Sequence, residues 1–228
     1  MSGARGRRAG CRRWLLLLVV AGLLGGCQTR PAASPPTSTA ATGKEQPPPI
    51  RFAGQKGTRT DPFLLAGGLT VFTAEHRGHG TFKVEVLTKD GKPQRVLFLV
   101  TGRYRGSTGR GLRGGIYRLA VSAGTPWKVK IAQPRGRAGA ALPQQYQGVS
   151  DALVGPFRVE RDVRVDLEHE GQGDVTVELV SDQGPSLYYL VDDSGRLKAS
   201  RTAVGLEPGN YYLNIEARRT WRVALHPG

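Results

Sequence analysis

A segment in the middle of the chain is repeated near its end, and this repeat constrains the fold more than any other feature. A glycine, a tyrosine and a tryptophan recur in the same order at one offset of 94 residues: Gly115, Tyr117 and Trp127 against Gly209, Tyr211 and Trp221. A period of this length indicates a tandem duplication. The sequence therefore predicts two copies of one small domain.

The 228 residues divide into four predicted segments. These are a signal peptide (1–26), a linker rich in Pro, Ala, Ser and Thr (27–50), a first β-sandwich repeat (51–133) and a second (145–228). A domain of this size buries roughly 60–65% of its unfolded surface, which is enough to fold without a metal or a disulfide. Cys11 and Cys27 both precede the repeats, so neither repeat can contain a disulfide.

The formal net charge of +15 is distributed unevenly. Residues 50–142 contain 17 Lys/Arg and 4 Asp/Glu, a net charge of +13, whereas residues 143–228 contain 9 and 13, a net charge of −4. The two repeats keep the same apolar pattern while the sign of their charge differs. We therefore expect the two repeats to share one fold and to differ in the charge of their surfaces.

The N-terminus has the pattern of a secretory signal. Five arginines precede an apolar run over residues 14–24, which is too short to span a bilayer stably. The run ends in Leu24-Gly25-Gly26-Cys27, which resembles the bacterial lipobox. That resemblance implies cleavage before Cys27 and attachment of a diacylglycerol through a thioether, and several acyl chains anchor more firmly than one. Two alternatives are an ordinary signal peptide in which Cys27 occurs by chance, and a twin-arginine signal.

The linker contains six prolines and almost no large apolar residue, so it cannot pack a core and is expected to be a disordered, semi-stiff spacer. Together with the predicted lipidation of Cys27, it indicates an extracytoplasmic lipoprotein anchored to the cell membrane. Gln28 after the cysteine resembles outer-membrane sorting if the host is diderm.

Both repeats have the period-two apolar pattern of half-buried strands. Thr81–Val86 alternates in this way, and no window of eleven residues after the signal has a helical stripe. The sequence therefore predicts an all-β fold with two tandem antiparallel β-sandwich or jelly-roll domains. It also predicts core positions for Trp127 and Trp221, a strand covered on both faces over 96–100, and a hairpin joining 115–121 to 127–131.

The spacing of these elements resembles small bacterial extracytoplasmic modules, in particular the pre-peptidase C-terminal jelly-roll domains. The segments that carry the resemblance are Gly80–Val84, Gly102–Ser107, Gly115–Leu119 and Trp127–Ile131. It covers about 80 residues per copy, although the second copy departs from it at Asp192–Gly195. The resemblance implies an accessory or adhesive module and brings no active site with it.

Residues 102–114 contain four arginines separated mainly by glycine and small polar residues: Arg103, Arg105, Arg110 and Arg113. Guanidinium groups bind phosphate and carboxylate bidentately, so one hypothesis is an anion-binding loop. The alternative is a solvated loop. Candidate ligands are anionic envelope polymers, lipid headgroups, the acidic second repeat and nucleic acid. Nucleic acid is disfavoured because the charge supplies only non-specific attraction.

The sequence offers little for metal binding or catalysis. His76 and His79 lack a second ligand cluster, and Asp192-Asp193-Ser194-Gly195 lacks the calcium-loop spacing, so we interpret both as turns. Motifs for hydrolase, zinc or phosphate-loop chemistry are missing. We therefore expect no enzyme, no cofactor and no metal.

Three hypotheses of function follow. The first is a membrane-anchored envelope lipoprotein that acts as a non-catalytic binding or structural module and contacts an envelope protein or polymer. The second is an electrostatic binder of anionic polymers, lipid headgroups or nucleic acid through the basic first repeat. In the third, the two oppositely charged repeats dock on each other.

Overall fold

The computed structural model describes residues 46–184 and 187–228. These residues contain seventeen β-strands and no helix, and they all belong to one compact unit. The predicted signal peptide and most of the linker, Cys27 included, lie outside the described residues. The all-β prediction is confirmed.

The first sandwich consists of two antiparallel sheets. Sheet A contains, in spatial order, β1 (Ile50–Gly54), β9 (Trp127–Ala132), β4 (Gly68–His76) and β7 (Tyr104–Leu112). Sheet B contains β2 (Thr58–Arg59), β8 (Gly115–Ser122), β5 (Thr81–Thr88) and β6 (Pro93–Thr101), and β3 (Phe63–Leu65) also pairs with β8.

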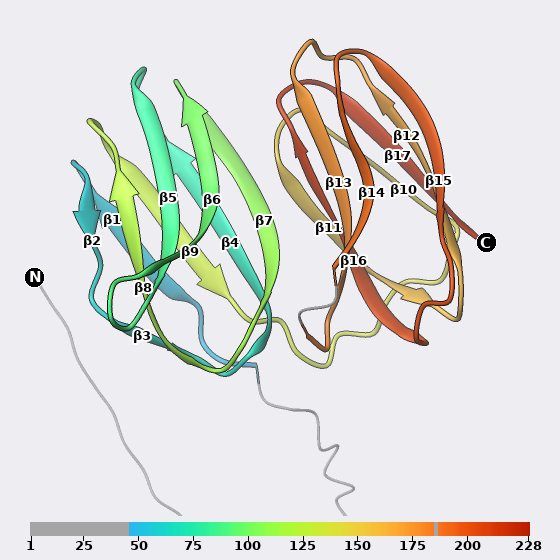
Figure 1. Ribbon diagram of the computed structural model, residues 1–228, viewed down its shortest axis with the longest axis horizontal. Helices are drawn as coiled ribbons and strands as arrows, with labels where there is room; N and C mark the ends of the chain where they lie inside the picture. The colour runs from blue at the N-terminus through green and yellow to red at the C-terminus, as the bar shows by residue number, and fades with distance from the viewer. Residues whose placement is uncertain (1–45, 185–186) are drawn as a thin grey trace, which may run out of the picture. The chain divides into compact units, whose positions relative to one another are not determined.

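The second sandwich repeats this order strand for strand (Figure 1). Sheet D contains β10 (Gln144–Gly148), β17 (Trp221–Pro227), β12 (Val163–His169) and β15 (Leu197–Ala203). Sheet C contains β11 (Ala152–Val159), β16 (Gly209–Ala217), β13 (Asp174–Ser181) and β14 (Leu187–Ser194). Two tandem antiparallel sandwiches are therefore present, as the repeat predicts.

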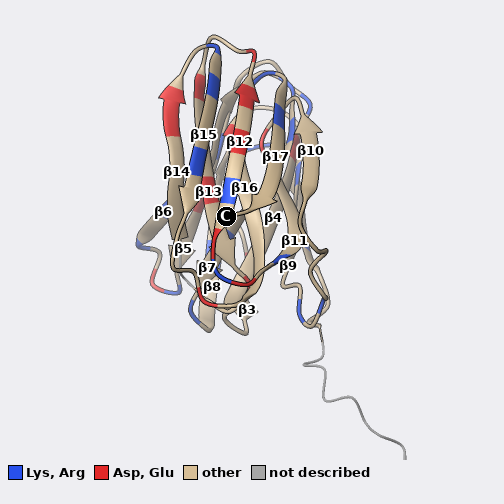
Figure 2. Cartoon of the chain, turned by 90° about the vertical axis from the view of Figure 1, so that its right-hand side faces the viewer, with Lys and Arg blue, Asp and Glu red and all other residues tan. Residues whose placement is uncertain are grey.

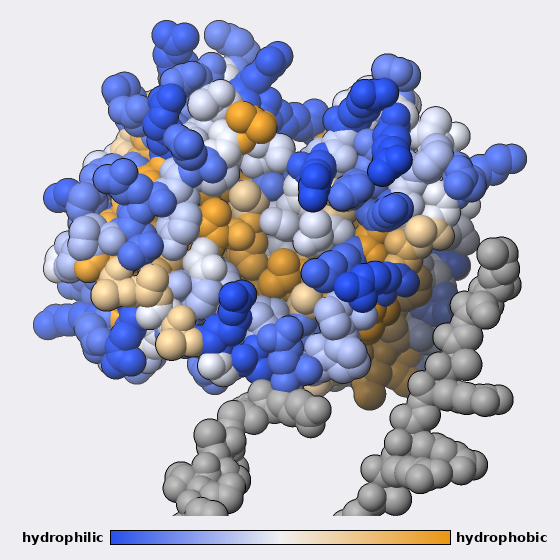
Figure 3. All heavy atoms as spheres, turned by 180° about the vertical axis from the view of Figure 1, so that it is seen from behind, coloured by the Kyte–Doolittle hydropathy of each residue, from blue (hydrophilic) through white to orange (hydrophobic). Residues whose placement is uncertain are grey.

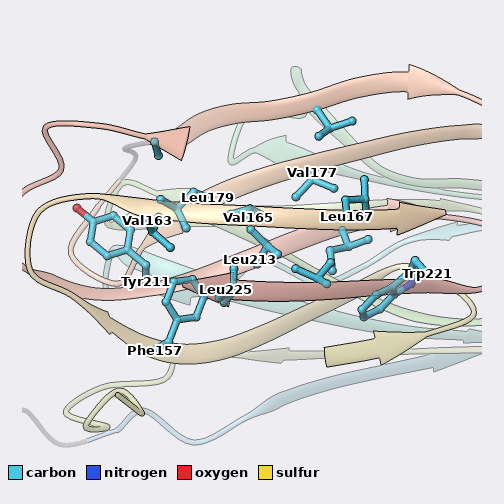
Figure 4. Close-up of a cluster of buried hydrophobic side chains, with 14 of the residues drawn as sticks. Phe157, Val163, Val165, Leu167, Val177, Leu179, Tyr211, Leu213, Trp221 and Leu225 are labelled. Atoms are coloured by element: carbon cyan, nitrogen blue, oxygen red, sulfur yellow. The ribbon is translucent and has the colours of Figure 1, made fainter. Parts of the chain in front are cut away.

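Alternating side chains of the facing sheets fill each core. In the second sandwich, Val163, Val165 and Leu167 of β12 are buried, and they face side chains of sheet C (Figure 4). Trp127 and Trp221 are 2% and 1% exposed, so their predicted core positions are confirmed. Burial of such aromatic side chains supplies much of the driving force for folding.

Both cores contain the same three hydrogen bonds to backbone carbonyls. The tryptophan Nε1 donates to Lys56 or Ser150, the tyrosine hydroxyl of Tyr117 or Tyr211 donates to Arg113 or Glu207, and the histidine Nδ1 of His76 or His169 bonds Gly102 or Gly195. Each bond is 2.8 or 2.9 Å long in both copies. Buried polar groups need such partners, so the duplication has preserved them together with the apolar residues.

Two local predictions are wrong. The segments 115–121 and 127–131 do not form a hairpin, because β8 belongs to sheet B and β9 to sheet A, so the connection crosses between the sheets. The apolar run over 96–100 is not covered on both faces. It lies in β6, a strand at the edge of sheet B, where Val96 and Leu99 are 40% and 55% exposed.

Candidate functional site

The arginine- and glycine-rich segment is a strand and not a loop. β7 pairs with β4 along its whole length, from Tyr104 opposite His76 to Leu112 opposite Gly68. Two of its glycines lie against neighbouring groups at the contact with the second sandwich. A Cβ at Gly106 would clash with the Tyr104 ring and lie 2.9 Å from the carbonyl oxygen of Asp151, and one at Gly109 would lie 2.6 Å from Leu153. Close packing at this contact therefore explains Gly106 and Gly109, which are typical of a loop in the sequence.

The second sandwich covers the free edge of β7. The backbone N–H of Ser107 donates to the carbonyl of Asp151 over 3.0 Å, and the N–H of Leu153 donates to Ser107 Oγ over 3.1 Å. Ser150 Oγ donates to the carbonyl of Arg105 over 2.7 Å. An uncovered edge strand is a template for aggregation, so this contact also protects β7.

Arg110 lies inside the contact between the sandwiches. It is 7% exposed, and its Nη1 donates to Glu178 Oε2 over 2.7 Å while its Nη2 pairs with Glu216. Asn214 Nδ2 donates to the same Glu178 oxygen over 2.8 Å. Asn214 Oδ1 accepts from Thr108 Oγ1 and from the N–H of Gly109. The charge of Arg110 is thus already balanced by two carboxylates.

Tyr104 is the first residue of β7, and it also contacts the second sandwich. Its hydroxyl donates to Asp151 Oδ2 over 2.7 Å, and its ring packs against Phe98 with the ring centres 5.4 Å apart. Burial raises the pKa of Asp151, and burial together with the neighbouring Asp151 carboxylate raises the pKa of Tyr104. Tyr104 is therefore part of the packing between the sandwiches.

The four arginines do not lie together. Arg103 and Arg105 border a shallow pocket with His76 and Arg77, and Arg113 follows the opposite end of β7. At about 3.3 Å per residue, the nine residues of β7 span on the order of 30 Å. Their anion-binding role stays a prediction for Arg103, Arg105 and Arg113, which are exposed.

A cluster of cations lies instead on the outer face of sheet A. The register places Arg51 opposite Lys130, and Lys128 opposite Glu75, which in turn faces Arg105. We call the four cations Arg51, Arg105, Lys128 and Lys130 the basic face. On the described strands of sheet A, Glu75 is the one carboxylate beside them, and it lies 3.5 Å from Arg105. Periodicity predicts that these side chains are exposed, but the strand order is needed to bring them together.

The corresponding face of sheet D is electrically balanced. Its cations each form an ion pair: Arg164 with Asp166 at 3.4 Å, Lys198 with Glu168 at 2.6 Å and Arg222 with Glu170 at 2.9 Å. Figure 2 shows basic and acidic residues side by side on β12, β15 and β17. At the positions that Arg51 and Lys130 occupy in the first sandwich, the second has Gln145 and Ala224.

This difference extends over both sandwiches. Among the described residues, three of the 17 cations in 50–142 lie in an ion pair, against five of the nine in 143–228. In the view of Figure 3, hydrophilic side chains project around the apolar areas of the surface. The first sandwich therefore carries positive charge that its own carboxylates do not balance.

The histidine and aspartate residues that the sequence offers as candidate metal ligands make hydrogen bonds within the fold. His76 is the last residue of β4, not part of a turn, and its ring nitrogens bond the carbonyl of Gly102 and Oγ1 of Thr125, each over 2.8 Å. Asp192 and Asp193 lie in β14 and not in a turn, and Asp192 accepts a hydrogen bond from Thr176. The part of the chain that the structure describes contains no group of three or more metal-ligating side chains. It also has no helix long and apolar enough to cross a membrane.

The chain matches no protein family and no curated protein. Distant matches occur among solved structures. The exported protein XepA of PBSX is 9% identical over 77% of this chain and 86% of its own, with a TM-score of 0.27. ZmpB from Clostridium perfringens, with its M60 catalytic domain and two CBM51 domains, is 6% identical over 78% of this chain and 34% of its own, with a TM-score of 0.28. The CBM22 tandem of Paenibacillus barcinonensis Xyn10C is 9% identical over 78% of this chain and 91% of its own, with a TM-score of 0.22.

Proposed function

We propose that this protein is a non-catalytic binding protein of the cell envelope that holds an anionic envelope polymer on the basic face of sheet A. The observation that carries the proposal is the unbalanced charge of that face: Arg51, Lys128 and Lys130 are exposed and have no carboxylate within ion-pair distance among the described residues. A flat row of cations fits a polymer with repeated charges better than a small molecule, which needs a concave site.

The fold suits such a role because the basic face lies on paired strands and not on loops. Lys128 and Lys130 are fixed on β9, which pairs with β1 on one side and β4 on the other. Binding would therefore need little ordering of the backbone, and the lost entropy would come mainly from the long side chains. The accessory role implied by the resemblance to pre-peptidase C-terminal modules is consistent with this proposal.

The second part of the proposal is the membrane anchor at Cys27. It rests on the lipobox-like segment Leu24–Cys27 and on the proline-rich linker that follows. Two or three acyl chains would hold the protein at the membrane, and the linker would let the sandwiches reach the polymer.

The basic face can be tested by measuring the affinity of the full chain, in neutral detergent, for polygalacturonate at increasing salt. Because bound cations release counterions, the triple variant R51Q/K128Q/K130Q should lower the affinity about tenfold or more and flatten the salt dependence. The matched control R164Q/K198Q/R222Q removes the same charge from sheet D, where carboxylates already balance it. Equal losses in both variants would contradict a specific role of the basic face.

The anchor can be tested by labelling cells with radioactive palmitate. The intact chain should incorporate the label and fractionate with membranes, whereas Cys27→Ala should do neither. Incorporation that persists in Cys27→Ala would refute lipidation at this residue, and Cys11→Ala is the control because Cys11 lies inside the predicted signal.

A further inference from the structure

A groove beside the junction of the two sandwiches is the second positively charged feature. Both sandwiches and the segment between them contribute to it, and its volume is about 1040 Å³. Its walls are the β3–β4 turn, the end of β7, residues 134–138, residues 182–184 and the start of β16. No carboxylate lies within ion-pair distance of its three arginines among the described residues: Arg113, Arg135 and Arg137.

Arg135 is held in the wall of this groove by backbone carbonyls. Its Nη1 donates to Leu69 over 3.2 Å and to Pro134 over 2.9 Å, and its Nη2 donates to Gly67. Gly68 lies against the guanidinium, and a Cβ there would be 3.4 Å from both terminal nitrogens. Carbonyl oxygens fix a guanidinium without neutralising its charge, so Arg135 is a preorganised cation.

Arg113 and Arg137 supply two further charges, and both are exposed. Asp182 is the one carboxylate among the described lining residues, and it accepts hydrogen bonds from Asn210 over 3.2 Å and from Gln183 over 2.8 Å. Asn210 also donates to the carbonyl of Arg137 and accepts from the N–H of Gly139, which fixes the segment against the second sandwich. The groove thus has a net charge of about +2 from three arginines and one aspartate.

We infer that this groove binds a phosphate group of an anionic envelope ligand. The exposed guanidinium groups of Arg113 and Arg137 can donate to phosphate oxygens, while Arg135, whose terminal nitrogens already donate to carbonyls, contributes its positive charge. The inference deepens the proposed function, because it gives an anionic envelope ligand a discrete site in addition to the basic face. It also gives the docked arrangement a role, since the walls come from both sandwiches.

The experiment measures binding of pyrophosphate to the full chain in neutral detergent by calorimetry. R113Q/R137Q should weaken binding about tenfold or more, since both side chains are exposed and make no hydrogen bond to another described residue that their loss would break. R164Q/R222Q removes the same charge from sheet D, outside both proposed binding surfaces, and should change binding by less than about twofold. Equal weakening in the two variants, or no measurable binding by the unaltered chain, would overturn the inference.

Asp182→Asn gives an independent test with the opposite sign. Its amide oxygen can still accept from Asn210, while the one carboxylate in the groove is lost, so pyrophosphate should bind about threefold or more tightly. Unchanged or weaker binding would contradict the assignment. A merely destabilising change would not increase the affinity.

Competition against pyrophosphate distinguishes the sources of the phosphate. Displacement by short polyglycerol-phosphate chains would identify a polymer, and displacement by phosphatidylglycerol added to the micelles would identify a lipid headgroup. If neither displaces pyrophosphate, the inference is wrong. If the unaltered chain binds pyrophosphate but not polygalacturonate, only the role of the basic face is refuted.

Discussion

The two sandwiches have the same strand order and the same buried hydrogen bonds, but they differ in whether the cations on their outer faces are paired with carboxylates. Trp127 and Trp221 each donate to a carbonyl 71 residues earlier, so the cores have kept their polar details. On the outer faces, in contrast, sheet D pairs its cations with carboxylates, whereas most cations of sheet A have no ion-pair partner within 46–184 and 187–228. The core specifies the fold, and the outer faces are free to acquire different ligands.

The contrast is sharpest at β7 and β15, which occupy the same place in the two sandwiches. β7 carries Arg110 where β15 carries Ala203, and the second sandwich covers β7. β15 remains a partly exposed edge strand among the described residues. The docked edge therefore has a buried cation that the free edge lacks, in addition to the backbone and side-chain hydrogen bonds described above.

Arg110→Ala should have the largest effect on stability, because it removes the cation and leaves Glu178 buried without a counter-charge. Breaking a buried ion pair in this way typically costs about 3–5 kcal/mol. The measurement is guanidinium unfolding of the full chain in neutral detergent, followed by tryptophan fluorescence. A loss below about 1 kcal/mol would show that the pair is not shielded from water.

The matched control is R110M/E178L, which replaces the buried pair by apolar side chains. It should recover much of the lost stability, because Glu216 is 38% exposed and can be solvated. If the double variant is as unstable as Arg110→Ala, the effect comes from packing and not from the uncompensated charge.

The buried histidines give the next largest effect. His76 Nε2 accepts from Thr125 Oγ1, whereas His169 Nε2 is buried with no partner among the described residues. Thr125→Val should make the first sandwich resemble the second by leaving an acceptor unsatisfied, at a cost of about 1–3 kcal/mol. Thermal unfolding would measure it, and Thr125→Ser should keep most of the stability because it retains the hydroxyl.

Sequence patterns predict the cores well because alternation within a strand is a local property. Val163, Val165 and Leu167 are buried as their spacing predicts. The hairpin over 115–131 is predicted wrongly, because turn residues do not say whether the next strand stays in the same sheet or crosses to the other. Strand order also decides which cations meet on the basic face, so that face could not be predicted.

The strand β7 could not be predicted for a related reason. Gly106 and Gly109 lie against Asp151 and Leu153, and Arg110 pairs with Glu178, all three of which belong to the other sandwich. The sequence does contain a signal: Glu178 and Asn214 interrupt apolar runs in β13 and β16. A polar residue inside such a run indicates a buried partner, although it does not identify Arg110.

The smallest predicted effect concerns pH, and it belongs to the second sandwich, because Asp151 stands where the first has Gly57. Burial raises the pKa of Asp151 above its ordinary value of 3.8. A carboxyl group whose pKa is raised by folding stabilises the folded state below its unfolded pKa, and this contribution is lost as the pH rises through the folded pKa.

Asp151→Asn cannot titrate, and its side chain can still accept one of the hydrogen bonds from Tyr104 and Ala217. The stability of the unaltered chain minus that of Asp151→Asn should therefore fall as the pH rises from about 3.8, and then level off. Guanidinium unfolding at a series of pH values measures this difference. A difference that rises with pH would mean that the hydrogen bonds from Tyr104 and Ala217 outweigh burial, and that the contact between the sandwiches favours the ionised carboxylate.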